Sequence, residues 1–204
     1  MSITWPLFGF NISKSETKFI RRLSRFLKEN PTAKLKVKPL IYSEKEKEYI
    51  LFYYAKKMFY LSKNQISMTN FYSSDSLSVE RINNKDTLFV EFLKKKIKNE
   101  QIHTVQEMCT LLIHSEKVNH EFDALSRKRK SAFLAQFIDD KVTSQIQFLK
   151  SSSVVPYNGY SFFELDISGE IPPSLLEAYK HINLVNDEKP RLNYIKDRIS
   201  IKRL

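Results

Sequence analysis

The strongest constraint on the fold is an alternation of strand and helix patterns near the start of the chain. Ser13 and Glu16 have the S-x-x-E spacing of a capping box, which opens an apolar-periodic helix that Asn-Pro at 30–31 ends. Residues 34–41 then alternate between lysine and apolar side chains, which is typical of a half-buried strand. Strand-forming residues at 4–12 precede the helix. The sequence therefore predicts a β-α-β unit.

The middle of the chain is predominantly helical in its patterning. Ser43 and Glu46 form a second S-x-x-E box before a helix whose aromatic side chains between 49 and 60 keep one side apolar. Residues 62–86 are rich in Ser and Asn and show little periodicity, which predicts a connection with at most a short strand or one turn of helix. Further helices are predicted over 87–98, 104–113 (capped by Thr104 and Glu107) and 118–139.

The last third of the chain predicts two more strands and a terminal helix. Residues 145–149 and 160–167 have strand patterns, and the loop 151–159 of Ser, Pro, Asn and Gly joins them. A helix is expected over 174–181. We therefore expect an α/β fold of the α+β sandwich type, with a mixed sheet of about four strands covered by helices. The expected domains are an α/β domain over 1–180 with a helical insertion at about 62–120, and a basic tail over 181–204.

Charge and composition limit the classes of partner without selecting one. The chain has 204 residues and a formal net charge of +11, which favours contact with nucleic acid, anionic lipid or an acidic protein. It contains only three glycines, so the P-loop and the dinucleotide-binding fingerprint are both excluded. No run approaches the roughly 20 apolar residues of a membrane-spanning helix. The first ten residues lack the basic start and long apolar run of a secretory signal.

The densest positive cluster is the run Arg127-Lys128-Arg129-Lys130. On a helix, four consecutive residues spread over all sides, so this run cannot form a patch on a single face. One interpretation is a solvated helix segment with one residue, such as Arg129, turned toward a neighbour. The other is binding of phosphate or anionic lipid.

Catalytic and metal-binding patterns are missing from the sequence. The four histidines are scattered without ligand spacing, and the single cysteine, Cys109, lies in an apolar-periodic stretch where it is expected to be buried. No G-x-S-x-G elbow occurs. The aromatic and basic residues over 49–60 fit a helix core better than a base-stacking surface. We expect no enzyme activity, no cofactor and no metal site.

Several segments together resemble a known family. The helix FIRRLSRFLKENP at 19–31, followed by the strand LKVKPLIY, is similar to the beginning of the OmpA-like fold, and LSRKRKSAFLAQF at 125–137 is similar to that family's LSxxRAxxVxxYL helix, with Arg129 on the motif arginine. The stretch AKKMFYL at 55–61 and the later segments DTLFVEFLKKK, YSFFELDI and PPSLLEAY resemble the OmpA-like terminal part of large AsmA-type envelope proteins of the Bacteroidetes kind.

The resemblance implies a fold, a role and a location. It implies the β-α-β-α-β order of the OmpA-like fold. It also implies a non-catalytic docking or tethering domain of an envelope protein involved in outer-membrane biogenesis or lipid transfer. The partner would be another envelope protein or an anionic lipid surface. The domain would lie in the periplasm or at the envelope as part of a longer chain, and in the cytoplasm if Met1 is the natural start.

The sequence departs from the family where peptidoglycan-binding members hold their ligand. Those members carry a T-D-x-x-G loop after the second strand, whose Asp acts with the motif arginine on a ligand that bears both ammonium and carboxylate groups. The corresponding stretch 41–45, Ile-Tyr-Ser-Glu-Lys, has neither the Asp nor the Gly, and only Glu44 or Glu46 could substitute. The candidate ligand-binding or anion-binding residues are Arg129, Arg127, Lys128, Tyr42 and Glu44.

Two other functions stay open at this stage. The first alternative is a basic nucleic-acid-binding or ribonucleoprotein subunit, which the net charge of +11 favours. The second is a peptidoglycan-binding domain, which the incomplete motif disfavours.

Overall fold

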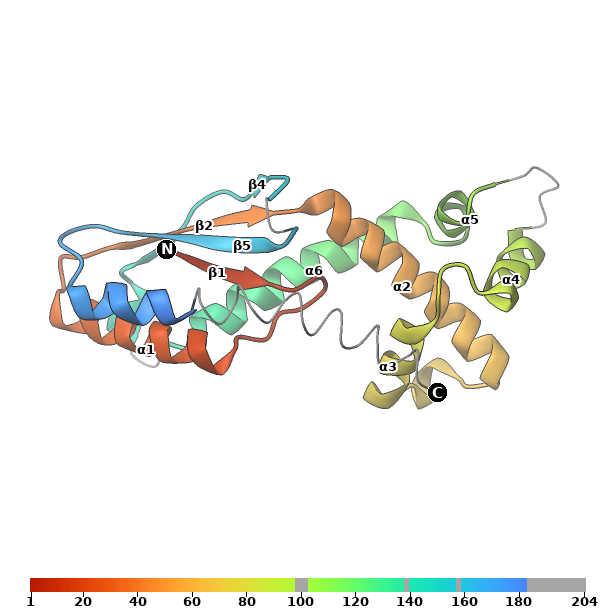
Figure 1. Cartoon of the computed structure of the whole chain (residues 1–204), viewed down its shortest axis with the longest axis horizontal. Helices are drawn as coiled ribbons and strands as arrows, with labels where there is room; N and C mark the ends of the chain where they lie inside the picture. The colour runs from red at the N-terminus through yellow and green to blue at the C-terminus, as the bar shows by residue number, and fades with distance from the viewer. Residues whose placement is uncertain (98–102, 138–139, 157–158, 183–204) are drawn as a thin grey trace. The chain divides into compact units, whose positions relative to one another are not determined.

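A computed structural model describes residues 1–97, 103–137, 140–156 and 159–182, and the chain divides into two compact units (Figure 1). The sheet unit comprises Met1–Ile41 and Lys128–Leu204, and the helical unit comprises Tyr42–Arg127. The expected basic tail therefore lies outside the described residues except for His181 and Ile182, which belong to a helix over 173–182.

The sheet unit is built on a mixed five-stranded sheet, so the expected α/β sandwich is confirmed. The strand order is β1-β5-β2-β3, and β4 also pairs with β2. β5 runs antiparallel to both β1 and β2, whereas β3 and β4 run parallel to β2. The strands are β1 (Ser2–Trp5), β2 (Leu35–Ile41), β3 (Ile146–Phe148), β4 (Ser152–Ser153) and β5 (Ser161–Ile167).

α1 (Lys14–Glu29) is the best-defined local element of the sheet unit. Ser13 and Glu16 form the expected capping box: the Ser13 hydroxyl accepts the Glu16 N–H at 3.2 Å, and the Glu16 carboxylate accepts the Ser13 N–H at 2.8 Å. The helix ends at Asn30, whose N–H donates to the carbonyls of Phe26 and Leu27. The Gln145 side chain, just before β3, donates to the carbonyls of residues 27, 30 and 33, which joins the end of α1 to the sheet.

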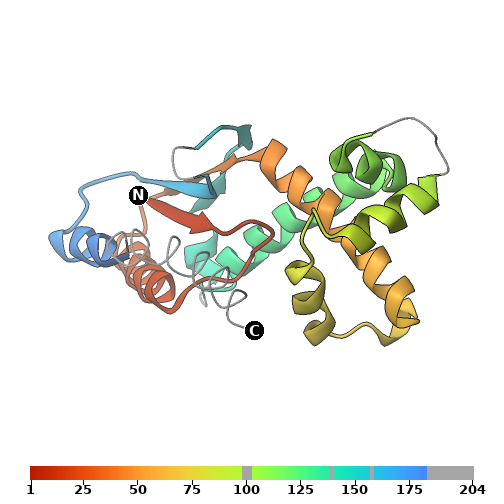
Figure 2. The ribbon, with the colours of Figure 1, turned by 45° about the vertical axis from the view of Figure 1, so that its right-hand side comes forward.

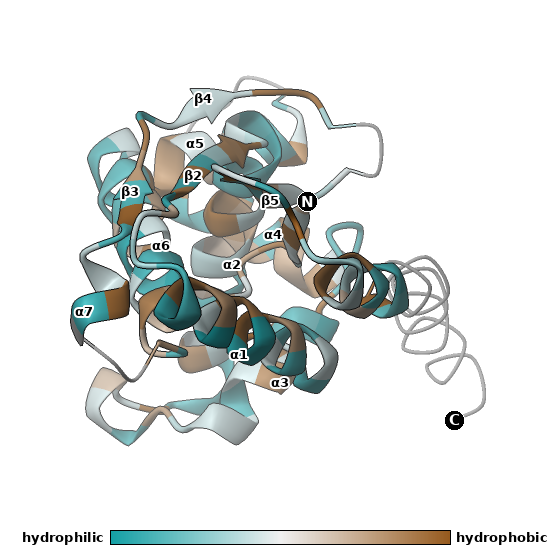
Figure 3. Cartoon of the chain, turned by 90° about the vertical axis from the view of Figure 1, so that its left-hand side faces the viewer, coloured by the Kyte–Doolittle hydropathy of each residue, from teal (hydrophilic) through white to brown (hydrophobic). Residues whose placement is uncertain are grey.

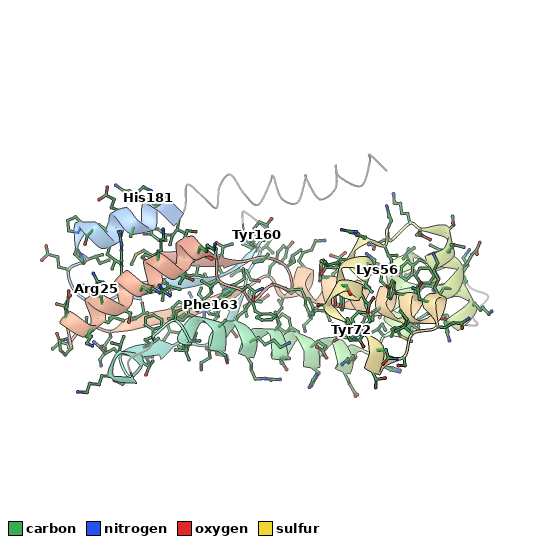
Figure 4. All side chains as sticks on the ribbon, turned by 90° about the horizontal axis from the view of Figure 1, so that it is seen from below. Arg25, Lys56, Tyr72, Tyr160, Phe163 and His181 are labelled. Atoms are coloured by element: carbon green, nitrogen blue, oxygen red, sulfur yellow. The ribbon has the colours of Figure 1, made fainter. Side chains whose placement is uncertain are left out.

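Three helices cover one face of the sheet. Helix 173–182, α1 and the last part of α6 (Ser115–Leu134) lie side by side on that face (Figures 3 and 4). Beneath them, Phe163 of β5 is the centre of an aromatic cluster, with ring centroids 5.2 Å from Trp5 and 5.8 Å from both Phe133 and Phe148. β5 alternates buried and exposed residues from Phe163 to Ile167, as the sequence predicts. The other face of the sheet carries the charged side chains of β2 and β5.

In the helical unit, shorter helices gather around the 22-residue helix α2 (Figure 2). α2 contacts α3, α4 and α5, and α4 also contacts α5. The Phe59 ring lies 5.6 Å from Phe89 and 5.5 Å from Phe92, measured between centroids. The capping box of Thr104 and Glu107 is present at the start of α5. The elements of the unit are α2 (Ser43–Asn64), η1 (Met68–Asn70), α3 (Ser73–Arg81), α4 (Thr87–Ile97), α5 (Val105–Leu112) and the first part of α6.

None of the described helices, in either unit, has the length and apolar content needed to cross a membrane.

Some local predictions are wrong. The second capping box does not form, because the helix begins at Ser43 itself and Tyr42 occupies the N-cap. The connection predicted over 62–86 contains the end of α2 and the whole of α3. α3 buries only Val79, so its sequence has almost no apolar period. The helical unit spans Tyr42–Arg127, and the helical insertion predicted at about 62–120 lies within it.

Two predicted boundaries also differ. The first strand ends at Trp5, because Pro6 lacks an N–H to pair and the chain turns at residues 6–9. α6 ends at Leu134, although the helix was expected to reach 139. Residues 138 and 139 lie outside the described residues, and α7 (Asp140–Thr143) follows as a short separate helix before β3.

Candidate anion-binding surface

The five residues predicted to bind a ligand divide between the two units. Tyr42, Glu44 and Arg127 belong to the helical unit, and Lys128 and Arg129 belong to the sheet unit. Glu44, Arg127 and Lys128 are exposed, and Tyr42 is half-buried. The Lys128 ammonium lies 5.4 Å from the centroid of the Phe10 ring. Neither unit by itself brings the five residues into one site.

Arg129 is a buried residue that holds a turn in place. It is only 2% exposed. Its Nε donates to the Gly9 carbonyl at 2.7 Å, and its Nη2 donates to the Pro6 carbonyl at 2.9 Å. The Gly9 N–H also donates to the Pro6 carbonyl, at 2.9 Å. The fork of the guanidinium thus fixes both ends of the turn that follows β1.

The turn at residues 6–9 is strained, which explains why it needs this support. Phe8 has φ of 58°, a left-handed conformation that is costly for a bulky side chain. A Cβ on Gly9 would lie 2.4 Å from Cγ of Pro6, so glycine is required there. Arg129 therefore has a structural role in the sheet unit, from a sequence distance of 120 residues.

Among the residues of the sheet unit that the structure describes, the outer side of α1 carries a uniformly positive surface. Its lysine and arginine side chains follow one another at intervals of four and three residues, and we name this set the α1 cation row. The row consists of Lys14, Lys18, Arg21, Arg25 and Lys28. At 100° per residue these positions fall within about 80° of one another, and they span about 21 Å of helix. All five are exposed.

The chemistry along this side of α1 is uniformly positive. Arg22 is also exposed, beside the row, and the only exposed acidic residue of the helix is its last one, Glu29. Within the described part of the chain, Lys14, Lys18, Arg21 and Arg25 make no ion pair. The opposite side of α1 buries Phe19, Ile20, Leu23 and Leu27 in the core. Packing of that apolar side therefore fixes the direction in which the cations point (Figure 4 labels Arg25).

The α1 cation row is marked in the sequence by the spacing of its cations and not by their local density. The run 127–130 has four cations in succession, but the structure turns one of them inward and leaves the others in different directions around α6. In α1 the cations are spaced by three and four residues, which places them on one side of the helix. The helical spacing of the charges, and not their density, therefore predicts a positively charged side of a helix.

The outer face of the sheet has a shallow cavity of about 400 Å³ with mixed charge. Lys36 and Lys38 of β2 stand opposite Asp166 and Glu164 of β5 in the antiparallel register. Met1, Leu149 and Leu165 complete the lining. Because two carboxylates lie among these lysines and the Met1 ammonium, this face is much less positive than the α1 cation row and attracts a polyanion less.

The ionisable groups of the helical unit form local pairs around α2. Burial and the neighbouring Glu121 carboxylate raise the pKa of Tyr54 well above its usual value. Lys117 donates to that carboxylate at 2.6 Å. Burial raises the pKa of the Cys109 thiol to about 12, with a small opposing effect of Lys56. Cys109 is completely buried, as expected, and a thiol in this state is unreactive.

Metal-binding geometry is also missing from the described ranges, in which no three His, Cys, Asp or Glu side chains come together as a cluster. A second cavity, of about 560 Å³, lies over α5 and is lined by His103, Thr104, Gln106, Glu107, Thr110 and Leu111. Thr104 and Glu107 in that lining are already bonded to each other as the helix cap.

Comparison with known proteins finds no matching family model, no matching curated protein and no matching solved structure.

Proposed function

We propose that this chain is a non-catalytic docking domain of an AsmA-type envelope protein, acting in outer-membrane biogenesis or lipid transfer. The observation that carries the docking proposal is the α1 cation row, a set of exposed cations aligned on one side of a helix. Surfaces of this kind attract acidic partners from solution and hold them by many weak contacts. The row occupies the exposed side of a helix whose other side is core, so a partner can reach it without rearranging the fold.

The element order supports the choice of family. The sheet unit runs β1-α1-β2, and after the helical unit the end of α6 leads into β3 and later β5. The β-α-β start agrees with the order that the resemblance implies. The stretch AKKMFYL, which the resemblance places on the second helix, lies in α2 of the helical unit, so in the sheet unit the end of α6 takes the place of that helix, and α7 and β4 are additional elements. The helical unit, Tyr42–Arg127, lies in the chain between β2 and the end of α6 and includes the predicted insertion at about 62–120.

The contacts of Arg129 favour a docking role over peptidoglycan binding. In the resemblance, Arg129 occupies the position of the arginine that holds the ligand's carboxylate. Here two of its N–H groups already donate to the carbonyls of Gly9 and Pro6, and the side chain is 2% exposed. A carboxylate would have to displace these bonds and release a strained turn.

The proposal is tested by measuring how much of the purified chain binds to envelope fragments from a Gram-negative bacterium at about 150 mM salt. At this salt concentration, electrostatic interactions between exposed charges more than about 8 Å apart are largely screened. Detergent-stripped sacculi and single-stranded RNA serve as separate targets. We expect retention on intact fragments, little on stripped sacculi, and RNA binding that weakens steeply with salt. Retention by RNA at higher salt without binding to envelope fragments would instead identify a nucleic-acid-binding subunit.

A further inference from the structure

We propose that the partner of the α1 cation row is the anionic phospholipid headgroup layer of a membrane surface. The inference rests on the proposed docking function and deepens it by naming the partner. The exposed positions of α1 are all Lys or Arg apart from Glu29, and no acidic side chain interrupts the row before the end of the helix. A row about 21 Å long can meet several lipid phosphates at once.

The surroundings of α1 suit an extended surface. Helix 173–182 lies on one side of α1 and the end of α6 on the other (Figures 3 and 4). The Phe19 and Tyr179 rings, with centroids 5.6 Å apart, join α1 to helix 173–182. Packed helices lie about 8–10 Å apart, so this layer of three is wider than the roughly 12 Å major groove that admits a single helix. The flanking helices therefore disfavour insertion of α1 into duplex DNA.

Single-stranded nucleic acid also fits this surface poorly. Non-specific binding of single strands uses exposed aromatic rings on which bases stack. Of the two aromatic residues of α1, Phe19 is buried and Phe26 is half-buried. The side chains of α1 itself therefore offer charge without an exposed ring. The ring of Phe10, four residues before the helix, is 39% exposed, but a single ring does not form a platform for successive bases.

Two exposed apolar side chains lie on segments next to α1, in the chain before it and on the helix packed beside it. Phe10, four residues before the helix, is 39% exposed, and Leu176, on the neighbouring helix 173–182, is 42% exposed. Apolar side chains beside a basic helix face are the combination that peripheral membrane-binding surfaces use, with charge for approach and apolar contact for retention.

The test is co-sedimentation of the whole chain with vesicles of equimolar phosphatidylglycerol and phosphatidylcholine, and with vesicles of phosphatidylcholine alone. The test variant is Arg21→Gln/Arg25→Gln. The control is Lys94→Gln/Lys95→Gln, which removes the same charge from exposed positions of α4. At roughly fivefold per charge, the test variant is expected to partition about 25-fold more weakly onto anionic vesicles than the unmodified chain. The partitioning of the control onto anionic vesicles is expected to fall less than about threefold. Vesicles of phosphatidylcholine alone are expected to bind neither the test variant nor the control.

A second variant separates charge from folding. Arg21→Lys/Arg25→Lys keeps both charges and is expected to bind within about twofold of the unmodified chain. If the Gln variant and the α4 control lost vesicle binding to the same extent, the α1 cation row would have no special role. Absence of binding of the unmodified chain to anionic vesicles would also contradict the inference. If envelope fragments retain the chain while phosphatidylglycerol vesicles do not, the lipid inference fails and the docking proposal stands. If neither retains it, both fail.

Discussion

Replacement of Phe163 with alanine is expected to lower the free energy of unfolding of the sheet unit by about 3–5 kcal/mol. Phe163 is 3% exposed and contacts the rings of Trp5, Phe133 and Phe148, so its removal leaves a cavity where β5, β1, β3 and α6 meet. Trp5 is the only tryptophan of the chain and its ring lies 5.2 Å from that of Phe163. Tryptophan fluorescence during urea unfolding therefore reports on this core.

Phe162→Ala is the matched control, because Phe162 is adjacent in β5, points to the other face of the sheet and is half-buried. It is expected to cost under about 1.5 kcal/mol. Similar losses for the two variants would mean that the aromatic cluster does not form the centre of the sheet unit.

Arg129→Ala is expected to cost about 3 kcal/mol of unfolding free energy, measured by the same fluorescence signal. The substitution removes two charge-assisted hydrogen bonds to the carbonyls of Pro6 and Gly9 and leaves the turn with Phe8 at φ of 58° without its support. Arg129→Lys is expected to recover less than half of the loss, because an ammonium cannot reproduce the fork of a guanidinium.

Arg127→Ala is the control for this second prediction. Arg127 lies two residues earlier on α6, is exposed, and is expected to change stability by less than about 0.5 kcal/mol. If Arg129→Ala destabilised the protein no more than Arg127→Ala, the buried hydrogen bonds to the turn would contribute nothing measurable. Arg129 would then be available for another role.

Local patterns were sufficient to predict most elements of the sheet unit. The capping box of Ser13 and Glu16, the Asn30 stop and the alternation in β2 and β5 are all encoded within a few residues, and each is confirmed. α3 was not predicted because a helix that buries one side chain leaves no period to detect. Its start depends instead on Asp75, whose carboxylate accepts the Tyr72 N–H at 2.8 Å and the hydroxyl of Tyr60 at 3.0 Å.

The candidate site also contains one feature that is encoded locally in the sequence and one that depends on distant residues. The α1 cation row follows from the spacing of Lys and Arg within one helix, so it is encoded in the sequence, although the run 127–130 has the higher local density of charge. The inward turn of Arg129 is one of the two interpretations of the run 127–130, and it is confirmed. Its partners, Pro6 and Gly9, were not predictable, because they lie more than a hundred residues away and accept through backbone carbonyls. Because every residue has a backbone carbonyl, the identity of a residue does not indicate that its carbonyl accepts a hydrogen bond from Arg129.

The most direct test of docking through α1 is lysine footprinting of the chain by acetylation and mass spectrometry, with and without phosphatidylglycerol vesicles. Lys14 and Lys18 belong to the α1 cation row, whereas Lys36 lies exposed in β2 of the same unit and serves as an internal control. We expect acetylation of Lys14 and Lys18 to fall at least about fivefold with vesicles, while that of Lys36 stays unchanged. Uniform protection of all three lysines, or protection of Lys36 alone, would contradict docking through α1.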